Sequence, residues 1–247
     1  MKKRRFVIGD IHGSHKGLVQ VLERAKFDYE VDELISLGDV VDGWPETAEC
    51  LDELMSIKNL IFILGNHDSW CLSYYNHNLK MDHIKTWCSH GGIATVISLE
   101  KNIHKITEYM NFLESAKFYH ILDGNKIFAH ASIPSAEQEL EKAEEFKFTW
   151  DRELIKRASH RRQKKSIDDR WEEIYVGHTP VNYFKIDHLL PQKWANLWAM
   201  DTASCFEGVI SMMDIDTKEV FQSDECCKLY PDHPGRNGIT YNEMLKK

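Results

Sequence analysis

Short apolar runs and helix-like segments alternate along the first third of the chain. Mostly apolar runs of strand length occupy positions 5–8, 34–37 and 60–64. Between them, apolar residues recur at the spacing of a helix face, first at positions 18, 21, 22 and 25 and then at 48, 51, 54 and 55. Ser14 is a suitable N-cap for the first helix, and Pro45 fits the first turn of the second. The pattern predicts three parallel strands joined by helices, as in an α/β fold.

A glycine and a group of polar residues follow each of these three predicted strands. The groups are Gly9-Asp10-Ile11-His12-Gly13, Gly38-Asp39-Val40-Val41-Asp42-Gly43 and Gly65-Asn66-His67-Asp68. Asp10 and Asp39 are 29 residues apart, and Asp39 and Asn66 are 27 apart, which suits a strand, a helix and the next parallel strand. We therefore expect the three groups to meet at the carboxyl edge of one sheet, where open α/β folds place their sites.

The remaining chain carries fewer signals. The stretch 69–118 is predicted to be mostly helical, and strands are predicted at 126–129, ending at His130, and at 173–176, ending at Gly177-His178. The stretch 194–220 reads as antiparallel strands with Asp201 in a loop between two of them. Because no repeat or linker interrupts this order, we expect residues 1–247 to form a single domain, with 222–247 as a surface C-terminal tail.

Composition narrows the class of protein. The 247 residues carry a net charge of −8, which argues against a general nucleic-acid-binding protein. The longest apolar run has five residues, too few for a membrane span, and no apolar signal segment follows the basic amino terminus. The six cysteines show no CxxC spacing and are expected to be reduced thiols of a cytoplasmic protein.

The polar residues at the predicted strand ends are of metal-binding types. Six of them offer oxygen or imidazole nitrogen: Asp10, His12, Asp39, Asn66, His130 and His178. Without cysteine, this set suits Mn²⁺, Fe or Zn²⁺ better than a metal that prefers thiolate. Six ligands are too many for one tetrahedral site with an open position, but they suffice for two metal ions that share a carboxylate. Such a pair can clamp the attacking and leaving oxygens of a phosphoryl displacement.

The same strings resemble the successive motifs of a known family. GDIHG, GDVVD, GNHD, His130-Ala131 and Gly177-His178-Thr179 are similar, in order, to the motifs of the calcineurin-like metallophosphoesterases. They most resemble the phosphoprotein-phosphatase branch, which includes phage and bacterial serine/threonine protein phosphatases and symmetrical diadenosine tetraphosphatases. The resemblance implies a four-layer α/β sandwich, in which two mixed β-sheets are flanked by helices.

The resemblance also implies a role for each matching residue. Two divalent transition-metal ions, Mn²⁺ first and Fe or Zn²⁺ as alternatives, would be held by Asp10 and His12 on one side and by Asn66, His130 and His178 on the other, with Asp39 as the bridge. A metal-bound hydroxide would attack phosphorus in line. His67 would be the general acid that protonates the leaving oxygen, and Asp42 would orient it. Arg152, together with Asn66, would hold the phosphate oxygens.

Three strings depart from the family pattern, one of them by Ser132 after His130-Ala131, where a glycine is common. Gly43-Trp44 stands where the protein phosphatases usually have Arg-Gly, so one phosphate-binding arginine is missing at its usual place. Arg161, Arg162 or a nearby lysine could replace it, or the substrate is held differently. Trp44 could stack on a substrate at the rim of the site or pack in the core. The late motif Asp201-Thr202-Ala203 has alanine where the family usually has glycine.

These observations predict a metal-dependent phosphomonoesterase. The first expected substrate is phosphoserine or phosphothreonine in a protein, and the alternative is a dinucleoside polyphosphate. A phosphodiesterase or nuclease is disfavoured, because those relatives usually continue with a second histidine where Thr179-Pro180 follows His178. The remaining alternative, from a different class, is a non-catalytic module that binds a phosphorylated ligand. A membrane or a broad nucleic-acid surface is not expected as a partner.

Overall fold

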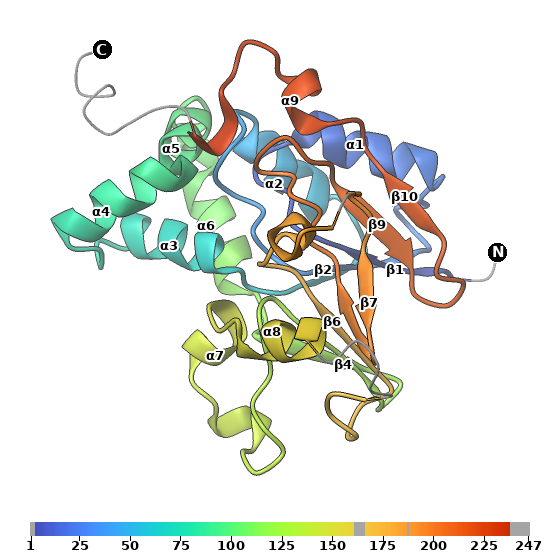
Figure 1. The fold of residues 1–247 in the computed structure, drawn as a ribbon. Coiled ribbons are helices and arrows are strands. Elements are labelled where there is room, and N and C mark those ends of the chain that lie inside the picture. Colours follow the sequence, from blue (N-terminus) through green and yellow to red (C-terminus); the bar gives the residue numbers. More distant parts are fainter. Residues whose placement is uncertain (1–2, 161–165, 187, 238–247) are drawn as a thin grey trace.

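Two five-stranded sheets form the centre of the protein. The computed structural model describes residues 3–160, 166–186 and 188–237 (Figure 1). The first sheet has the strand order β10-β9-β1-β2-β3. Its members are β1 (Arg5–Ile8), β2 (Glu33–Ser36), β3 (Asn59–Phe62), β9 (Ser211–Asp214) and β10 (Val220–Gln222). Strands β1, β2 and β3 are parallel, and β9 runs antiparallel to both β1 and β10.

The second sheet has the order β4-β5-β6-β8-β7. Its members are β4 (Tyr119–Leu122), β5 (Lys126–Ala129), β6 (Glu173–Val176), β7 (Gln192–Trp194) and β8 (Leu197–Ala199). Strands β5, β6 and β8 are parallel, whereas β4 and β7 pair antiparallel at the two edges. Each sheet is therefore mixed, and each has a parallel part whose carboxyl ends lie on one side.

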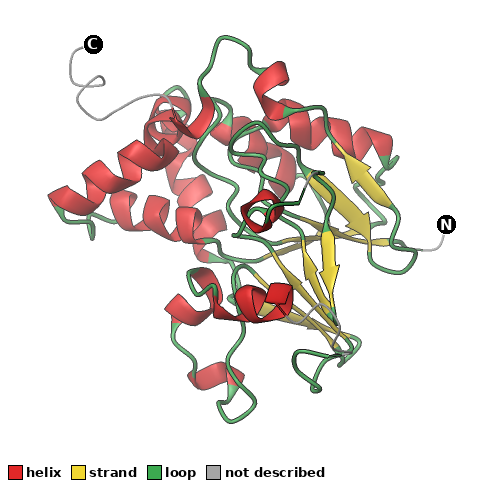
Figure 2. Cartoon of the chain, in the orientation of Figure 1, coloured by secondary structure: helices red, strands yellow, loops and turns green. Residues whose placement is uncertain are grey.

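Helices cover the outer face of each sheet (Figures 1 and 2). The first sheet is covered mainly by α1 (His15–Arg24), α2 (Thr47–Met55), α3 (Asn66–Tyr75), α5 (Ile93–Glu100) and α6 (Ile106–Glu114), with α4 (Met81–Trp87) beside them. The second is covered by α7 (Glu145–Thr149) and α8 (Glu153–His160). A short helix, α9 (Cys226–Leu229), follows β10 and lies near α1.

Strand alternation divides the apolar residues into three layers. In β1, Phe6 and Ile8 pack against the helices, whereas Val7 faces the other sheet, as the two-residue period of a strand requires. Phe128 and Tyr175 of the second sheet meet that central layer with stacked rings whose centroids are 4.6 Å apart. The order helix, sheet, sheet, helix confirms the predicted four-layer α/β sandwich.

Most predicted elements are found, with some differences in bounds and pairing. The strands at 5–8, 126–129 and 173–176 have the predicted bounds, whereas those predicted at 34–37 and 60–64 are found at Glu33–Ser36 and Asn59–Phe62. The second helix begins at Thr47, so Pro45 precedes it rather than lying in its first turn. The region after 194 is not one set of antiparallel strands, because β8 pairs in parallel with β6 while β9 belongs to the first sheet. The loop that contains Asp201 therefore crosses between the sheets.

The cysteines form no disulfide bonds with one another in the structure, in line with the reduced thiols expected from the sequence. All six cysteines are free, and five of them are buried. Within the described residues, none of the helices combines the length and the apolar character needed to cross a bilayer.

Candidate active site

Eight of the nine predicted site residues, all except Arg152, follow strands whose carboxyl ends meet between the two sheets. Asp10 and His12 follow β1, Asp39 and Asp42 follow β2, and Asn66 and His67 form the first turn of α3 after β3. His130 follows β5 and His178 follows β6, so the second sheet contributes as well. Each of these eight side chains is at most 6% exposed. The structure thus brings together the residues that the sequence placed at separate strand ends.

Several of these residues have a left-handed backbone. The φ angles are 52° for His12, 51° for Asp39, 70° for Asp42 and 65° for His178. Such angles are unfavourable for residues other than glycine, and they concentrate at functional sites. Hydrogen bonds hold the first two loops in place, because the N–H groups of Ile11 and His12 both donate to the Asp39 carbonyl, at 3.1 and 2.9 Å.

Asp68 fixes the loop after β2 to the start of α3. Its carboxylate accepts the N–H of Asp39 at 2.8 Å, of Val40 at 3.0 Å and of Gly65 at 3.0 Å. Asp68 lies in the first turn of α3, which begins at Asn66. From there its carboxylate both accepts the N–H of the N-cap residue Gly65 and joins the two loops.

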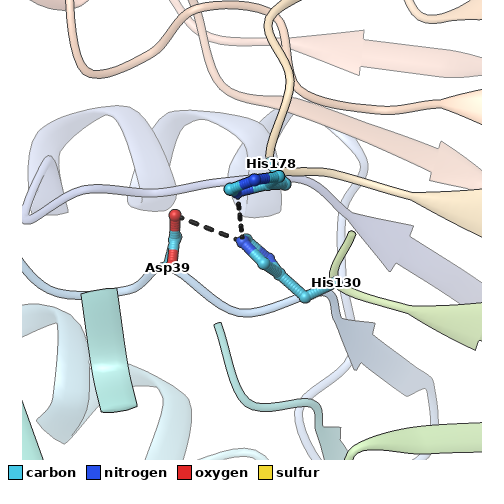
Figure 3. Close-up of side chains that lie close together, drawn as sticks. All are labelled: Asp39, His130 and His178. Atoms are coloured by element: carbon cyan, nitrogen blue, oxygen red, sulfur yellow. Dashed lines mark hydrogen bonds and ion pairs between the residues drawn. The ribbon is translucent and has the colours of Figure 1, made fainter. Parts of the chain in front are cut away.

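Two triads of potential metal ligands share one carboxylate. The first triad is Asp10, His12 and Asp39, and the second is Asp39, His130 and His178. Within each triad the ligand atoms lie within 4.8 Å of one another. Figure 3 shows the second triad, in which His130 Nε2 is 3.3 Å from Asp39 Oδ2 and 3.2 Å from His178 Nδ1. Asn66 joins this triad, with Oδ1 3.1 Å from His130 Nε2.

Backbone carbonyls orient all three histidines of the triads. Nδ1 of His12 is 3.1 Å from the Val41 carbonyl, and Nδ1 of His130 is 2.8 Å from the Leu37 carbonyl. Nε2 of His178 is 3.2 Å from the Trp150 carbonyl. A ring nitrogen that donates to a carbonyl leaves the other nitrogen with its lone pair free, as a metal ligand requires.

The electrostatics of the cluster suit bound cations. Burial raises the pKa of Asp10 well above its usual range, and the carboxylates of Asp201 and Asp39 add to this effect. Burial alone would lower the pKa of His130, but Asp39 outweighs it and raises that pKa to about 9. The position of the His130 ring therefore favours positive charge, as a metal ion there would supply. The donor types, the burial and the shared carboxylate fit a pair of divalent ions.

A second interaction pairs His67 with Asp42 beside the triads. Nδ1 of His67 is 2.6 Å from Oδ2 of Asp42. Asp42 also accepts hydrogen bonds from Trp87 Nε1 and Thr95 Oγ1, both at 2.7 Å, and the sequence did not reveal these two partners. Burial raises the pKa of Asp42 to about 8 and lowers the pKa of His67 to about 3. Both shifts favour the uncharged pair, in which a proton lies close to the His67 ring.

Similarity to known proteins agrees with this geometry. Residues 3–201 match the family model described as calcineurin-like phosphoesterase. The chain belongs to this family.

The similar proteins include members with different substrates in their names. Over 217 residues the chain is 26% identical to serine/threonine-protein phosphatase 1 of Salmonella typhimurium, covering 85% of this chain and 91% of that protein. It is 41% identical to the symmetrical bis(5'-nucleosyl)-tetraphosphatase of Pseudomonas entomophila, but over only 76 residues, which are 26% of that protein. A solved metallophosphoesterase from Sphaerobacter thermophilus superposes with a TM-score of 0.54 at 19% identity, covering 90% of this chain and 88% of that one.

A cavity of about 180 Å³ opens at the triads of this phosphoesterase. Its walls include His12, Asp39, Asn66, His67 and His178, together with two arginines, Arg152 and Arg236. Arg152 was predicted to line the site. Arg236 was not, because it lies in the C-terminal segment and outside the family motifs. The expected substitutes Arg161 and Arg162 lie outside the described residues.

Trp44 is a core residue. It is 1% exposed, its Nε1 donates to the Ser204 carbonyl at 2.7 Å, and its ring stacks on Tyr230. The suggestion that Trp44 stacks on a substrate at the rim is therefore wrong, because a buried ring with a satisfied N–H is not accessible. The packing alternative is confirmed.

The late phosphoesterase motif shows why glycine is common at its third position. Asp201 lines the cavity, and its Oδ1 accepts the N–H of Ala203 at 2.9 Å. Ala203 has a φ of 63°, in the left-handed region that glycine adopts without strain. Alanine at 203 keeps this turn, so the departure from the family pattern leaves Asp201 in place.

Proposed function

We propose that this phosphoesterase is a metal-dependent phosphomonoesterase that removes phosphate from phosphoserine or phosphothreonine in proteins. The observation that carries the proposal is the pair of buried triads sharing Asp39, with the His67–Asp42 pair in the same site. The choice of a protein substrate is supported by the Salmonella relative, because that similarity extends over most of both chains. The six free thiols support a cytoplasmic location.

The two triads would hold two divalent ions. Asp10 and His12 would bind one, Asn66, His130 and His178 the other, and Asp39 both. We propose Mn²⁺, with Fe or Zn²⁺ as alternatives, because the donors are oxygen and imidazole nitrogen. When bound, such ions lower the pKa of a coordinated water and neutralise charge on the phosphate.

The side chains around the ions supply the remaining chemistry. Nδ1 of His67 is engaged by Asp42, so its Nε2 is the atom that would protonate the leaving oxygen. The Arg152 guanidinium would contact the non-bridging phosphate oxygens in a forked geometry, and the Asn66 amide would assist it. Together these groups bind, orient and protonate a substrate that enters the 180 Å³ cavity.

A second candidate substrate, a dinucleoside polyphosphate, is favoured by a basic surface next to the cavity. Arg152, Lys156, Arg157 and His160 line a neighbouring cavity of about 430 Å³ together with two carboxylates, Asp151 and Glu153, so basic groups are in the majority there. Arg152 lines both cavities. Further phosphates of an extended substrate would find complementary charge there. The local similarity to the Pseudomonas tetraphosphatase agrees with this alternative.

A substrate panel with Mn²⁺ present tests the proposal. It contains a phosphoserine peptide, diadenosine tetraphosphate, a mononucleotide and bis-nitrophenyl phosphate, and the matched inactive control is Asp39→Asn. The highest kcat/KM on the phosphopeptide supports a protein phosphatase. The highest value on diadenosine tetraphosphate supports the second candidate, and the highest on the diester contradicts both. If metal binds but no substrate is turned over, a non-catalytic binding module replaces the proposal.

A further inference from the structure

The C-terminal segment 223–237, here named the strap, is anchored to the protein beside the site. Its helix α9 buries Cys226, whose N–H donates to the Gly208 carbonyl at 2.8 Å. Tyr230 is 5% exposed and stacks on Trp44, with ring centroids 5.3 Å apart and planes 19° apart. The Tyr230 hydroxyl accepts the N–H of Lys16 at 3.0 Å and bonds Glu46. The strap is thus fixed to α1 and to the loop after β2.

Gly235 brings the strap close to the indole of Trp44. Its φ is 63°, and a Cβ there would lie 2.9 Å from Trp44 Cη2 and 3.3 Å from the Cys205 carbonyl oxygen. Only glycine allows both this turn and this approach. Trp44 therefore sets the position of the residue that follows.

That residue is Arg236, which lines the 180 Å³ cavity at the triads. Its N–H donates to the Cys205 carbonyl at 3.4 Å, and its guanidinium lies 5.6 Å from the centroid of the Phe206 ring. Arg236 lines the same cavity as Arg152 and the two triads. Among the residues that the structure describes, no carboxylate lies within 4.0 Å of either guanidinium.

Two guanidinium groups without carboxylate partners repel each other in one cavity, where Arg152 is exposed and Arg236 is half-buried. Desolvation lowers the pKa of Arg152, and the charge of Arg236 lowers it further. An anion bound between the two groups would offset this repulsion and satisfy their N–H donors. The donors of a guanidinium match the oxygens of a phosphate group in geometry.

We propose that Arg236 binds the phosphate of the substrate together with Arg152, so that the strap completes the active site. This inference rests on the proposed phosphate-ester substrate. Position 43 supplies no arginine in this chain, and a side chain there would be strained, because Gly43 has a φ of 104° and a Cβ would lie 3.2 Å from the His12 carbonyl oxygen. The neighbouring Trp44 instead packs against the strap, which places Arg236 in the cavity.

The test measures phosphate binding separately from turnover. Inorganic phosphate is titrated calorimetrically into Mn²⁺-loaded wild type, Arg236→Ala, Arg236→Lys and Lys228→Ala. Lys228 is the matched control, since it is a cation of the same strap, its side chain is 70% exposed, and it pairs with Glu225 outside the cavity. We expect Kd to rise about 10- to 100-fold in Arg236→Ala and less in Arg236→Lys, which keeps the charge but loses the fork. Lys228→Ala should bind as wild type does.

The outcomes separate this inference from the proposed function. If Arg236→Ala, with wild-type metal content and melting temperature, binds phosphate as tightly as wild type, the inference is wrong even where wild type hydrolyses phosphate esters. If phosphate binding depends on Arg236 but wild type turns over no ester, the inference that Arg236 binds phosphate is upheld and the proposed activity is wrong. If Lys228→Ala weakens binding as much as Arg236→Ala, the effect belongs to the overall charge of the strap, which also contradicts the inference.

Discussion

At the scale of single residues, His67 is the group whose removal should separate catalysis from metal binding. Its ring faces the cavity, but its link to Asp39 is through the backbone, since the His67 N–H donates to Asp39 Oδ1 at 2.9 Å. Asparagine keeps that backbone bond and cannot act as an acid.

We therefore predict that His67→Asn keeps the metal content of wild type and lowers kcat about 10²- to 10⁴-fold on a phosphopeptide. The defect should be smaller on p-nitrophenyl phosphate, whose leaving group needs no proton. Metal analysis and steady-state kinetics check both parts, with His77→Asn, an exposed site at the other end of α3, as the control. Wild-type turnover of His67→Asn on the poor leaving group would give His67 another role.

Asp39 is the residue common to both triads. We predict that Asp39→Asn loses both metal ions, because one carboxylate is shared, whereas His12→Gln loses one and keeps the other. Elemental analysis of the purified variants after dialysis gives the metal-to-protein ratio. A ratio near one for Asp39→Asn would show that Asp39 does not bridge.

The sequence predicted the candidate metal ligands better than the residues that hold them in position. The candidate metal ligands could be found because they stand at or near the ends of apolar runs: Asp10, His12, Asp39, Asn66, His130 and His178. The partners of Asp42 could not, because Trp87 and Thr95 lie in a helical region without a motif. Arg236 could not be predicted either, because its place depends on a tertiary contact, the packing of the strap on Trp44.

At the scale of elements, the junction between β1 and β2 is held by one buried carboxylate. Asp32 is 2% exposed and accepts hydrogen bonds from Arg4 Nη2 at 2.5 Å, from the Arg4 N–H at 3.1 Å and from the Asp28 N–H at 2.9 Å. Burial alone would raise the pKa of Asp32, but these bonds outweigh it and lower that pKa below 3.8.

We predict that Asp32→Asn lowers the free energy of unfolding by on the order of 1.5–3 kcal/mol at pH 7, as loss of hydrogen bonds to a charged group does. The folded-state pKa lies below the unfolded value of about 3.9, so the contribution is complete above that value. It is lost as the pH falls through the folded-state pKa. Urea denaturation between pH 3 and 7 should show the difference shrinking at low pH, whereas Asp224→Asn, an exposed partner of Arg24, should change little. A pH-independent difference would assign the effect to packing.

Strand positions were more predictable than strand partners. Runs such as 126–129 and 173–176 are buried on both faces, so their apolar character marks their bounds. Strands β8 and β9 are also largely apolar, and no local sequence pattern indicates that they belong to different sheets. That choice depends on which sheet edge is free once the other strands have paired.

At the scale of the whole molecule, the site connects the two sheets. Asp10, His12 and Asp39 come from loops of the first sheet, and His130 and His178 from loops of the second. The N–H of His178 already reaches across to Asp10 Oδ2 at 3.1 Å. Ions held by both triads would add further connections between the halves.

We predict that EDTA lowers the melting temperature by roughly 10–20 °C relative to protein with excess Mn²⁺. Each of the two sites, held at 100 times its Kd, contributes about 2.7 kcal/mol, and each kcal/mol corresponds to about 2–4 °C at this size. Calorimetry of wild type and of Asp39→Asn checks this, and the variant should not respond to EDTA. Hydrogen exchange should increase together in loops 38–43 and 177–179. An increase confined to one loop would mean that the ions do not join the sheets.

The left-handed backbone at His12, Asp39, Asp42 and His178 also sets how the protein can adapt. Each such residue costs about 1–2 kcal/mol relative to a residue without a Cβ. Glycine at these positions would relieve that strain, but it would also remove buried hydrogen bonds and candidate metal-binding atoms. Losing those contacts costs at least as much as the strain, so the strained backbone and the site have to be kept together. A thermostable active enzyme has to gain its stability elsewhere in the molecule.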